Sequence, residues 1–163
     1  MTVRLDSPPD TRRYAGRREA RECLIMSVRF EVVLACFLRD ETPAETLDAL
    51  RWHLGLLVDR PPSVSAADHP DRLLCPDPAS SLPGGDVASL QRQRHWLAGA
   101  QQTQAWGLYS RTVWPDDALP GLAKVLELVA GNIAEAGYGG FYRDVRSVDA
   151  TALEFDTPPD LRG

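Results

Sequence analysis

The chain has 163 residues, of which 44% are hydrophobic and 25% charged, and its formal net charge is −5. A chain of this length and composition can bury its own core in one domain, which excludes the disordered and fibrous classes. The acidic balance argues against a nucleic-acid partner, because phosphate recognition needs a clustered basic surface.

The N-terminal segment, residues 1–25, is polar, contains Pro8 and Pro9, and carries six arginines against four acidic residues. Such a segment has little apolar surface to bury, so we expect a disordered basic tail. A basic arm that binds an acidic partner is the alternative. Because Met26 directly precedes the first apolar segment, it is a candidate natural start. We expect one α+β domain over 26–157 and a frayed end over 158–163.

The first predicted strand, residues 28–39, is apolar on both faces. Its even positions form one continuous hydrophobic face, as packing on a core requires. The opposite face has Arg29 and Arg39 at its ends, but its middle is apolar and consists of Val33, Ala35 and Phe37. Some other group is therefore expected to cover that middle.

A helix is predicted directly after this strand, in DETPAETLDALRWHLGLL. Thr42 and Glu45 have the spacing of a capping box, and Pro43 suits a first helical position. A leucine stripe at helical spacing follows, and Trp52 and His53 beside it are expected to pack on the sheet. The stripe consists of Leu47, Leu50, Leu54 and Leu57.

Residues 59–86 are rich in proline, glycine, serine and aspartate and are predicted to be mostly loop, with a short strand near 72–75. Residues 87–104 are interpreted as one arm of a hairpin. Residues 105–115, rich in aromatic and β-branched side chains, should form an inner strand.

The second predicted helix begins at the caps Asp116 and Asp117, with Pro120 in its first turn, and ends at Gly137. Two strands should follow, near 138–146 and 151–156. The run GYGG at 137–140 enters a strand, so it is interpreted as a helix end followed by a close approach to a neighbouring strand.

This order of elements predicts an α+β fold. We expect a two-layer sandwich in which two long helices cover one face of a mostly antiparallel sheet of about five strands, a ferredoxin-like arrangement. The other face of the sheet is then left to water or to a partner.

Candidate interaction or pocket residues follow from that uncovered face. Strand alternation places Val33 and Phe37 there, joined by either Tyr109 and Val113 or Trp106 and Leu108. Tyr142 or Phe141 joins from the later strand, with Arg111 or Arg143 near the rim. The candidate set is Val33, Phe37, Trp106, Tyr109, Arg111, Tyr142 and Arg143.

Three groups could bury this apolar face: the loop after the first helix, a second copy of the chain, or a separate ligand. An apolar patch rimmed by charge often marks a protein contact, so homodimerisation is the first hypothesis. The corresponding function is a non-catalytic interaction or regulatory protein. The alternative is a small-molecule binding protein or enzyme whose pocket lies between the sheet and the 59–86 loop. An immunity-type partner of a toxin is a third hypothesis, based on size and charge alone.

Catalytic and cofactor motifs are not found. The sequence has no nucleophile elbow, zinc-protease motif, phosphate loop or dinucleotide fingerprint. Cys23, Cys36 and Cys75 lie far apart, without metal-ligand spacing, so we expect free thiols, no metal and no cofactor. His53, His69 and His95 are each interpreted as structural or surface residues, although an imidazole suits acid-base work.

The longest apolar run is shorter than the ~20 residues that span a bilayer. Residues 1–25 also contain no stretch like a secretory signal. We therefore expect a cytoplasmic protein with no membrane partner.

Several quoted segments together resemble a group of small bacterial α+β proteins with no attached activity. They are LRDETPAETLDALRWHLG, the PGG turn, LYSRTVWPDDALPGLAKVLELVA, GYGGFYRDV and TALEF, which cover most of residues 28–156. The shared features are helix starts and strand ends. The resemblance therefore implies a fold and carries over no functional residues, and the basic tail departs from it.

Overall fold

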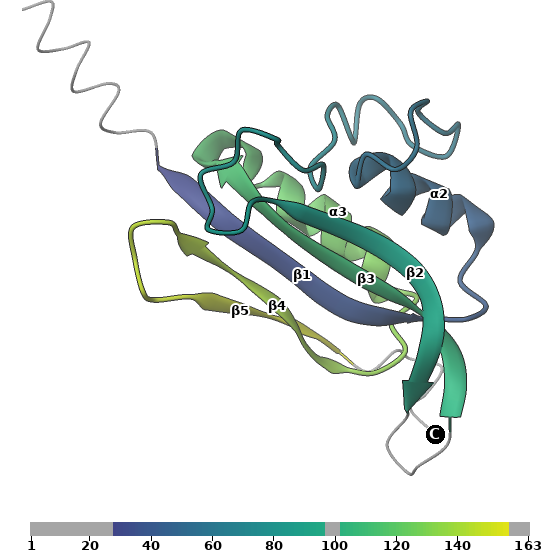
Figure 1. Cartoon of the computed structure of the whole chain (residues 1–163). Helices are drawn as coiled ribbons and strands as arrows, with labels where there is room; N and C mark the ends of the chain where they lie inside the picture. Colours follow the sequence, from purple (N-terminus) through teal and green to yellow (C-terminus); the bar gives the residue numbers. More distant parts are fainter. Residues whose placement is uncertain (1–27, 97–101, 157–163) are drawn as a thin grey trace, which may run out of the picture.

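The computed structural model describes residues 28–96 and 102–156. The expected tail, Met26 and the frayed C-terminal end lie outside these residues. The elements in chain order are β1 (Arg29–Arg39), α2 (Ala44–His53), β2 (Val87–Trp96), β3 (Gln102–Pro115), the 3₁₀ turn η1 (Asp116–Ala118), α3 (Gly121–Ala130), β4 (Gly137–Asp144) and β5 (Thr151–Phe155) (Figure 1).

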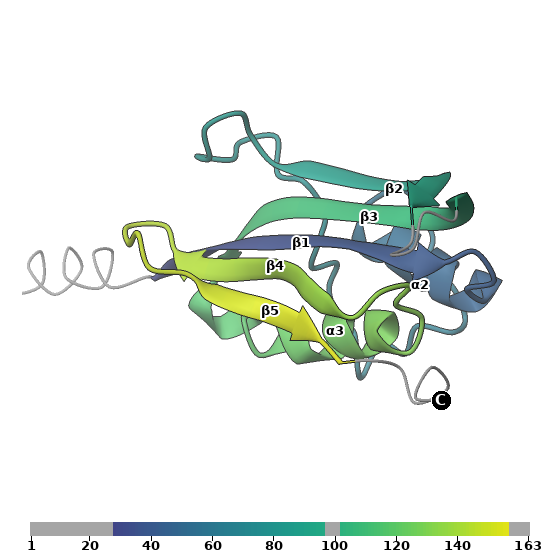
Figure 2. The same cartoon turned by 90° about the horizontal axis from the view of Figure 1, so that it is seen from below.

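The strands form one sheet in the order β2-β3-β1-β4-β5, and every neighbouring pair is antiparallel. Both helices lie on the same face of this sheet (Figure 2). The connection through α2 links β1 to β2 across β3, and the connection through α3 links β3 to β4 across β1. The predicted α+β class, with two helices and a five-stranded antiparallel sheet, is confirmed.

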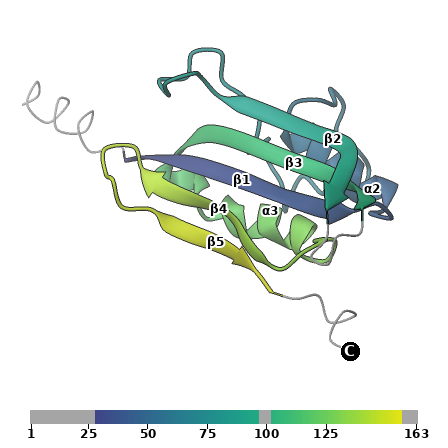
Figure 3. The same ribbon diagram turned by 60° about the horizontal axis from the view of Figure 1, so that its bottom comes forward.

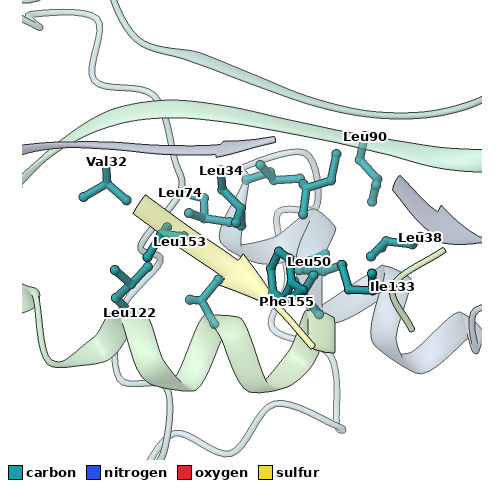
Figure 4. Close-up of a cluster of buried hydrophobic side chains, with 14 of the residues drawn as sticks. Val32, Leu34, Leu38, Leu50, Leu74, Leu90, Leu122, Ile133, Leu153 and Phe155 are labelled. Carbon is teal, nitrogen blue, oxygen red and sulfur yellow. The ribbon is translucent and has the colours of Figure 1, made fainter. Parts of the chain in front are cut away.

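The core lies between the sheet and the helices. On β1 the even residues face it, and Val32, Leu34 and Leu38 are almost completely buried. Leu50 of α2 and Leu74 of the following loop belong to the same cluster (Figure 4). The even-residue face of the first strand is therefore the core face, as its alternation predicts.

The start of the first helix differs from the predicted capping box. Pro43 is the N-cap and no side chain caps the helix. The buried Thr42 hydroxyl instead donates to the carbonyl oxygen of Arg39 at 2.6 Å. Thr42 therefore closes the turn between β1 and α2, and the helix ends at His53 before the predicted stripe is complete.

The second helix is shorter than predicted, because the chain after it joins the sheet. α3 ends at Ala130 rather than Gly137. The N–H of Arg39 donates to Asn132 and the N–H of Ala134 donates to Phe37, both at 2.8 Å. The predicted caps Asp116 and Asp117 form the turn η1, without a side-chain cap to α3.

The close approach predicted for GYGG is found at Gly140. Its φ is +135°, and a Cβ there would lie 2.0 Å from the carbonyl oxygen of Val33 on β1. Only glycine lets β4 approach β1 in this conformation.

The long loop between α2 and β2 packs on the helices, and no strand forms at 72–75. Val64 is buried against Ala49 and Trp52 of α2. The guanidinium carbons of Arg60 and Arg72 lie 4.4 and 5.6 Å from the centre of the Trp52 ring. Trp52 was expected to pack on the sheet; its partners are in this loop instead.

His53 is fully buried and also holds the loop. Its Nδ1 accepts the N–H of Leu73 at 3.3 Å, so Nε2 carries the proton and faces Nδ1 of His69 at 3.2 Å. Burial, together with the charges of His69 and Arg60, lowers the pKa of His53 to about 4. His53 is therefore a neutral link between α2 and the loop, rather than a residue packed on the sheet.

Candidate interaction face

The sheet surface turned away from the helices is called the open face here. Cross-strand partners share a face, so the register defines its members: Val33 pairs with Arg111 and Phe141, and Ala35 pairs with Tyr109. Figure 3 views the molecule with the strands in front of the helices. The central part of the open face consists of Glu31, Val33, Ala35 and Phe37 of β1, Tyr109, Arg111 and Val113 of β3, and Phe141 and Arg143 of β4.

Five of the seven predicted site residues lie on the open face, and two do not. Those on it are Val33, Phe37, Tyr109, Arg111 and Arg143. Trp106 pairs with Leu38 and Tyr142 pairs with Val32, which places both on the helix side. Of the alternatives left open by the sequence, Tyr109 with Val113 is the pair on the open face, and Phe141 takes the place of Tyr142.

Trp106, Tyr109, Arg111 and Tyr142 therefore cannot line one pocket against the loop, as the small-molecule hypothesis required. A cavity of about 500 Å³ does lie beside the loop. It is lined by loop residues 68–73 with Thr112, Trp114 and Asp117, and by none of those four side chains. The predicted lining is wrong, because strand alternation separates its members onto two faces.

A buried ion-pair cluster, missed by sequence reasoning, occupies one end of the open face. The Glu31 side chain is 3% exposed. Arg111 and Arg143 each donate from Nε to one of its two carboxylate oxygens at 2.7 Å. Burial raises the pKa of Glu31, but the two hydrogen bonds and charges outweigh it, so the pKa is lowered. The sequence signal for this cluster is Glu31, an acidic residue within an otherwise apolar predicted strand.

The other end of the open face contains a stacked pair of rings. Phe37 and His95 stack with centroids 3.9 Å apart and planes 24° apart. The far part of the β2–β3 hairpin curves strongly (Figure 1), and His95 of β2 reaches β1 through its stacking on Phe37. His95 Nε2 lies 3.4 Å from a carboxylate oxygen of Glu135, and only 10% of the His95 side chain is exposed. The expected surface position of His95 is therefore wrong.

Between these two ends the open face contains a depression of about 400 Å³, called the hollow here. Ala35 and Gly107, the smallest residues of β1 and β3, form its floor, Phe37 and Tyr109 supply rings, and Ser89 and Gln93 of β2 form one wall. Glu135, Ala136 and Tyr138 form the opposite wall. The hollow thus depends on the chain that joins α3 to β4.

The described residues limit the chemistry of this region. They contain no group of three or more His, Cys, Asp or Glu side chains that could hold a metal ion. Neither of their helices has the length and apolar character needed to cross a bilayer. What the open face offers is aromatic surface, hydrogen-bonding groups and paired charges, which suit binding.

The resemblance to a group of small bacterial α+β proteins stays a prediction. Comparison of the chain with protein-family models, with curated proteins and with solved structures found no match. The function is therefore inferred from the geometry of the open face alone.

Proposed function

We propose that this chain is a non-catalytic interaction protein that self-associates through the open face of its sheet. The supporting observation is the uneven covering of the sheet. Both helices lie on one side (Figure 2). On the other, the end of the loop reaches Arg111 through the carbonyl oxygen of Pro83 and Val33 is buried, but Tyr109 and Val87 are each 40% exposed. An aromatic and apolar surface rimmed by charge is typical of a protein contact.

The size of the open face favours a weak dimer. Four strands spaced ~4.8 Å apart and seven residues of ~3.4 Å each give roughly 450 Å² per copy. Two stacked copies would bury on the order of 900 Å², which is near the lower limit for specific contacts. We therefore propose a reversible, concentration-dependent dimer.

The charges on the open face support a self-complementary stacking. Arg111 and Arg143 surround one carboxylate, Glu31, and leave that end of the face positive. Glu135 lies near the opposite end, beside the Phe37 and His95 rings. A two-fold axis running across the strands would place the positive end of each copy over the Glu135 end of the other.

Two further proposals concern the fold and the location. The arrangement is proposed to be ferredoxin-like with one added edge strand, since β2-β3-β1-β4 are joined by two strand-helix-strand connections and β5 extends the edge. A cytoplasmic location is supported by the free thiols of Cys36 and Cys75, because oxidising compartments favour disulfides.

Light scattering coupled to size-exclusion chromatography, from about 10 μM to about 1 mM protein, tests the dimer. We expect the molar mass of the wild-type chain to rise from monomer towards dimer over this range. Tyr109→Glu should remain monomeric, because it places a carboxylate inside the contact. Val148→Glu is the matched control, since Val148 is 90% exposed in the β4–β5 turn; it should dimerise as wild type. A wild-type chain that is monomeric throughout would contradict the proposal.

A further inference from the structure

We infer that the hollow on the open face is a binding site for a small, uncharged, planar heteroaromatic molecule that carries a cyclic amide. Its volume of about 400 Å³ is within the usual range of small-molecule sites. The hollow is complete within one chain. The inference goes beyond self-association, and because Tyr109 lines the hollow and also lies in the proposed dimer contact, the ligand and the second copy would compete for the open face.

The amide of Gln93 is placed in the hollow by a glycine. Gly107, in the middle of β3, has no positive φ that would require glycine. A Cβ at this position would lie 2.6 Å from Nε2 and 3.0 Å from the side-chain carbon of the Gln93 amide. The missing side chain therefore leaves the space that the amide occupies against the sheet.

Hydrogen-bonding groups in the hollow lack protein partners within the described chain. The side chains of Ser89, Gln93, Tyr109 and Tyr138 line it, and none makes a hydrogen bond to another described residue. A glutamine amide presents a donor and an acceptor side by side. The edge of a cyclic amide presents the complementary acceptor and donor, as a base edge does to glutamine.

The shape and charge of the hollow indicate that the ligand, besides its cyclic amide, is flat and uncharged. Tyr109 is 40% exposed and offers a ring surface, whereas one face of the Phe37 ring is already stacked on His95, and rings stack best on a flat partner. Among the described residues, no lysine, arginine or histidine lines the hollow, so it offers no cation to bind an anion such as phosphate. A flat, neutral molecule satisfies both conditions.

Quinazolin-4-one, a planar two-ring cyclic amide, is a suitable probe. Titrated into the full-length ¹⁵N-labelled chain, it should shift the backbone amide signals of Ala35, Gly107 and Tyr138, with a Kd of about 0.1–1 mM. Gln93→Leu should weaken binding about tenfold by removing the paired hydrogen bonds. Gly107→Ala should also weaken it, because the new methyl group displaces the Gln93 amide.

Two controls separate recognition from general effects. Gln104→Leu replaces an exposed glutamine on β3 that does not line the hollow, and it should bind the probe as wild type. Quinoline, which has two rings but no amide, should bind wild type and Gln93→Leu equally. Amide spectra of each variant report whether it folds.

The inference is overturned if quinazolin-4-one shifts no signals of the hollow up to its solubility limit, or shifts signals elsewhere. It is also overturned if Gln93→Leu and Gln104→Leu bind the probe equally. The titration is made at a protein concentration at which light scattering shows a monomer, so a negative result cannot come from a dimer that covers the hollow, and the dimer itself is read separately from molar mass.

Discussion

Acidification from about pH 7.5 to about pH 5.0 is expected to lower the unfolding free energy by about 2 kcal/mol through His53 alone. His53 is fully buried, and its Nδ1 accepts the N–H of Leu73. Burial keeps it neutral in the folded chain, where its pKa is lowered to about 4 from an ordinary 6.5. The unfolded chain therefore binds a proton in a range where the folded chain does not.

The sign and size of this change in unfolding free energy follow from the pKa values of His53 in the folded and unfolded chain. Well above pH 6.5, from about pH 7.5 upward, both states are neutral at His53, and the stability does not depend on its titration. Between pH 6.5 and about 4 the unfolded state binds more protons, so the unfolding free energy falls as the pH falls. The difference reaches about 2 kcal/mol at pH 5 and about 3 kcal/mol when both states are protonated.

Urea unfolding at fixed ionic strength, followed by tryptophan fluorescence, measures this difference. His53→Gln is the non-titrating comparison, and it should lose about 2 kcal/mol less than wild type between the two pH values. The variant is expected to be less stable at about pH 7.5, because it changes a fully buried side chain, so only the change with pH is compared. Equal losses in the two proteins would refute the assignment of His53 as a neutral, buried link.

The remaining predictions concern the sheet. Glu31→Gln should lower the unfolding free energy by about 2 kcal/mol at neutral pH in the same urea assay, because Arg111 and Arg143 lose their shared carboxylate; an unchanged value would show that the cluster does not contribute. Gly140→Ala should destabilise by more than about 3 kcal/mol, because its φ is +135° and the Cβ meets the Val33 carbonyl. Gly131→Ala, at φ −68° with open space around it, should be neutral or stabilising by about 0.5 kcal/mol. Equal thermal midpoints for the two alanine variants would refute the steric argument.

The sequence predicts the elements of the fold better than their ends. Alternation in residues 28–39 and 105–115 locates β1 and β3, because one face of each must be apolar to pack on the helices. The end of α3 could not be found in this way. Residues 131–136 keep an acceptable helical pattern, and only hydrogen bonds to Phe37 and Arg39, distant in the chain, show that they pair with β1.

The candidate site was predictable in part. The central strand alone placed Val33 and Phe37 on the open face. On the other strands, the face on which a residue lies depends on the register of pairing with β1, and the sequence of one strand does not show this register. Trp106 and Tyr109 were therefore both candidates. His95 contacts Phe37 although β3 lies between their strands, and this contact has no local sequence signal.

The position of β1 affects how this chain folds during synthesis. Among the described strands, β1 comes first in the chain and is also the central one, since its two neighbours are β3 and β4. Arg29 pairs with Pro115, and Phe30 pairs with Asp144. Neither edge of β1 can therefore pair until β3 or β4 has left the ribosome, which requires most of the chain to be synthesised. Pairings this distant in sequence slow folding and expose an unpaired apolar strand to chaperones and aggregation.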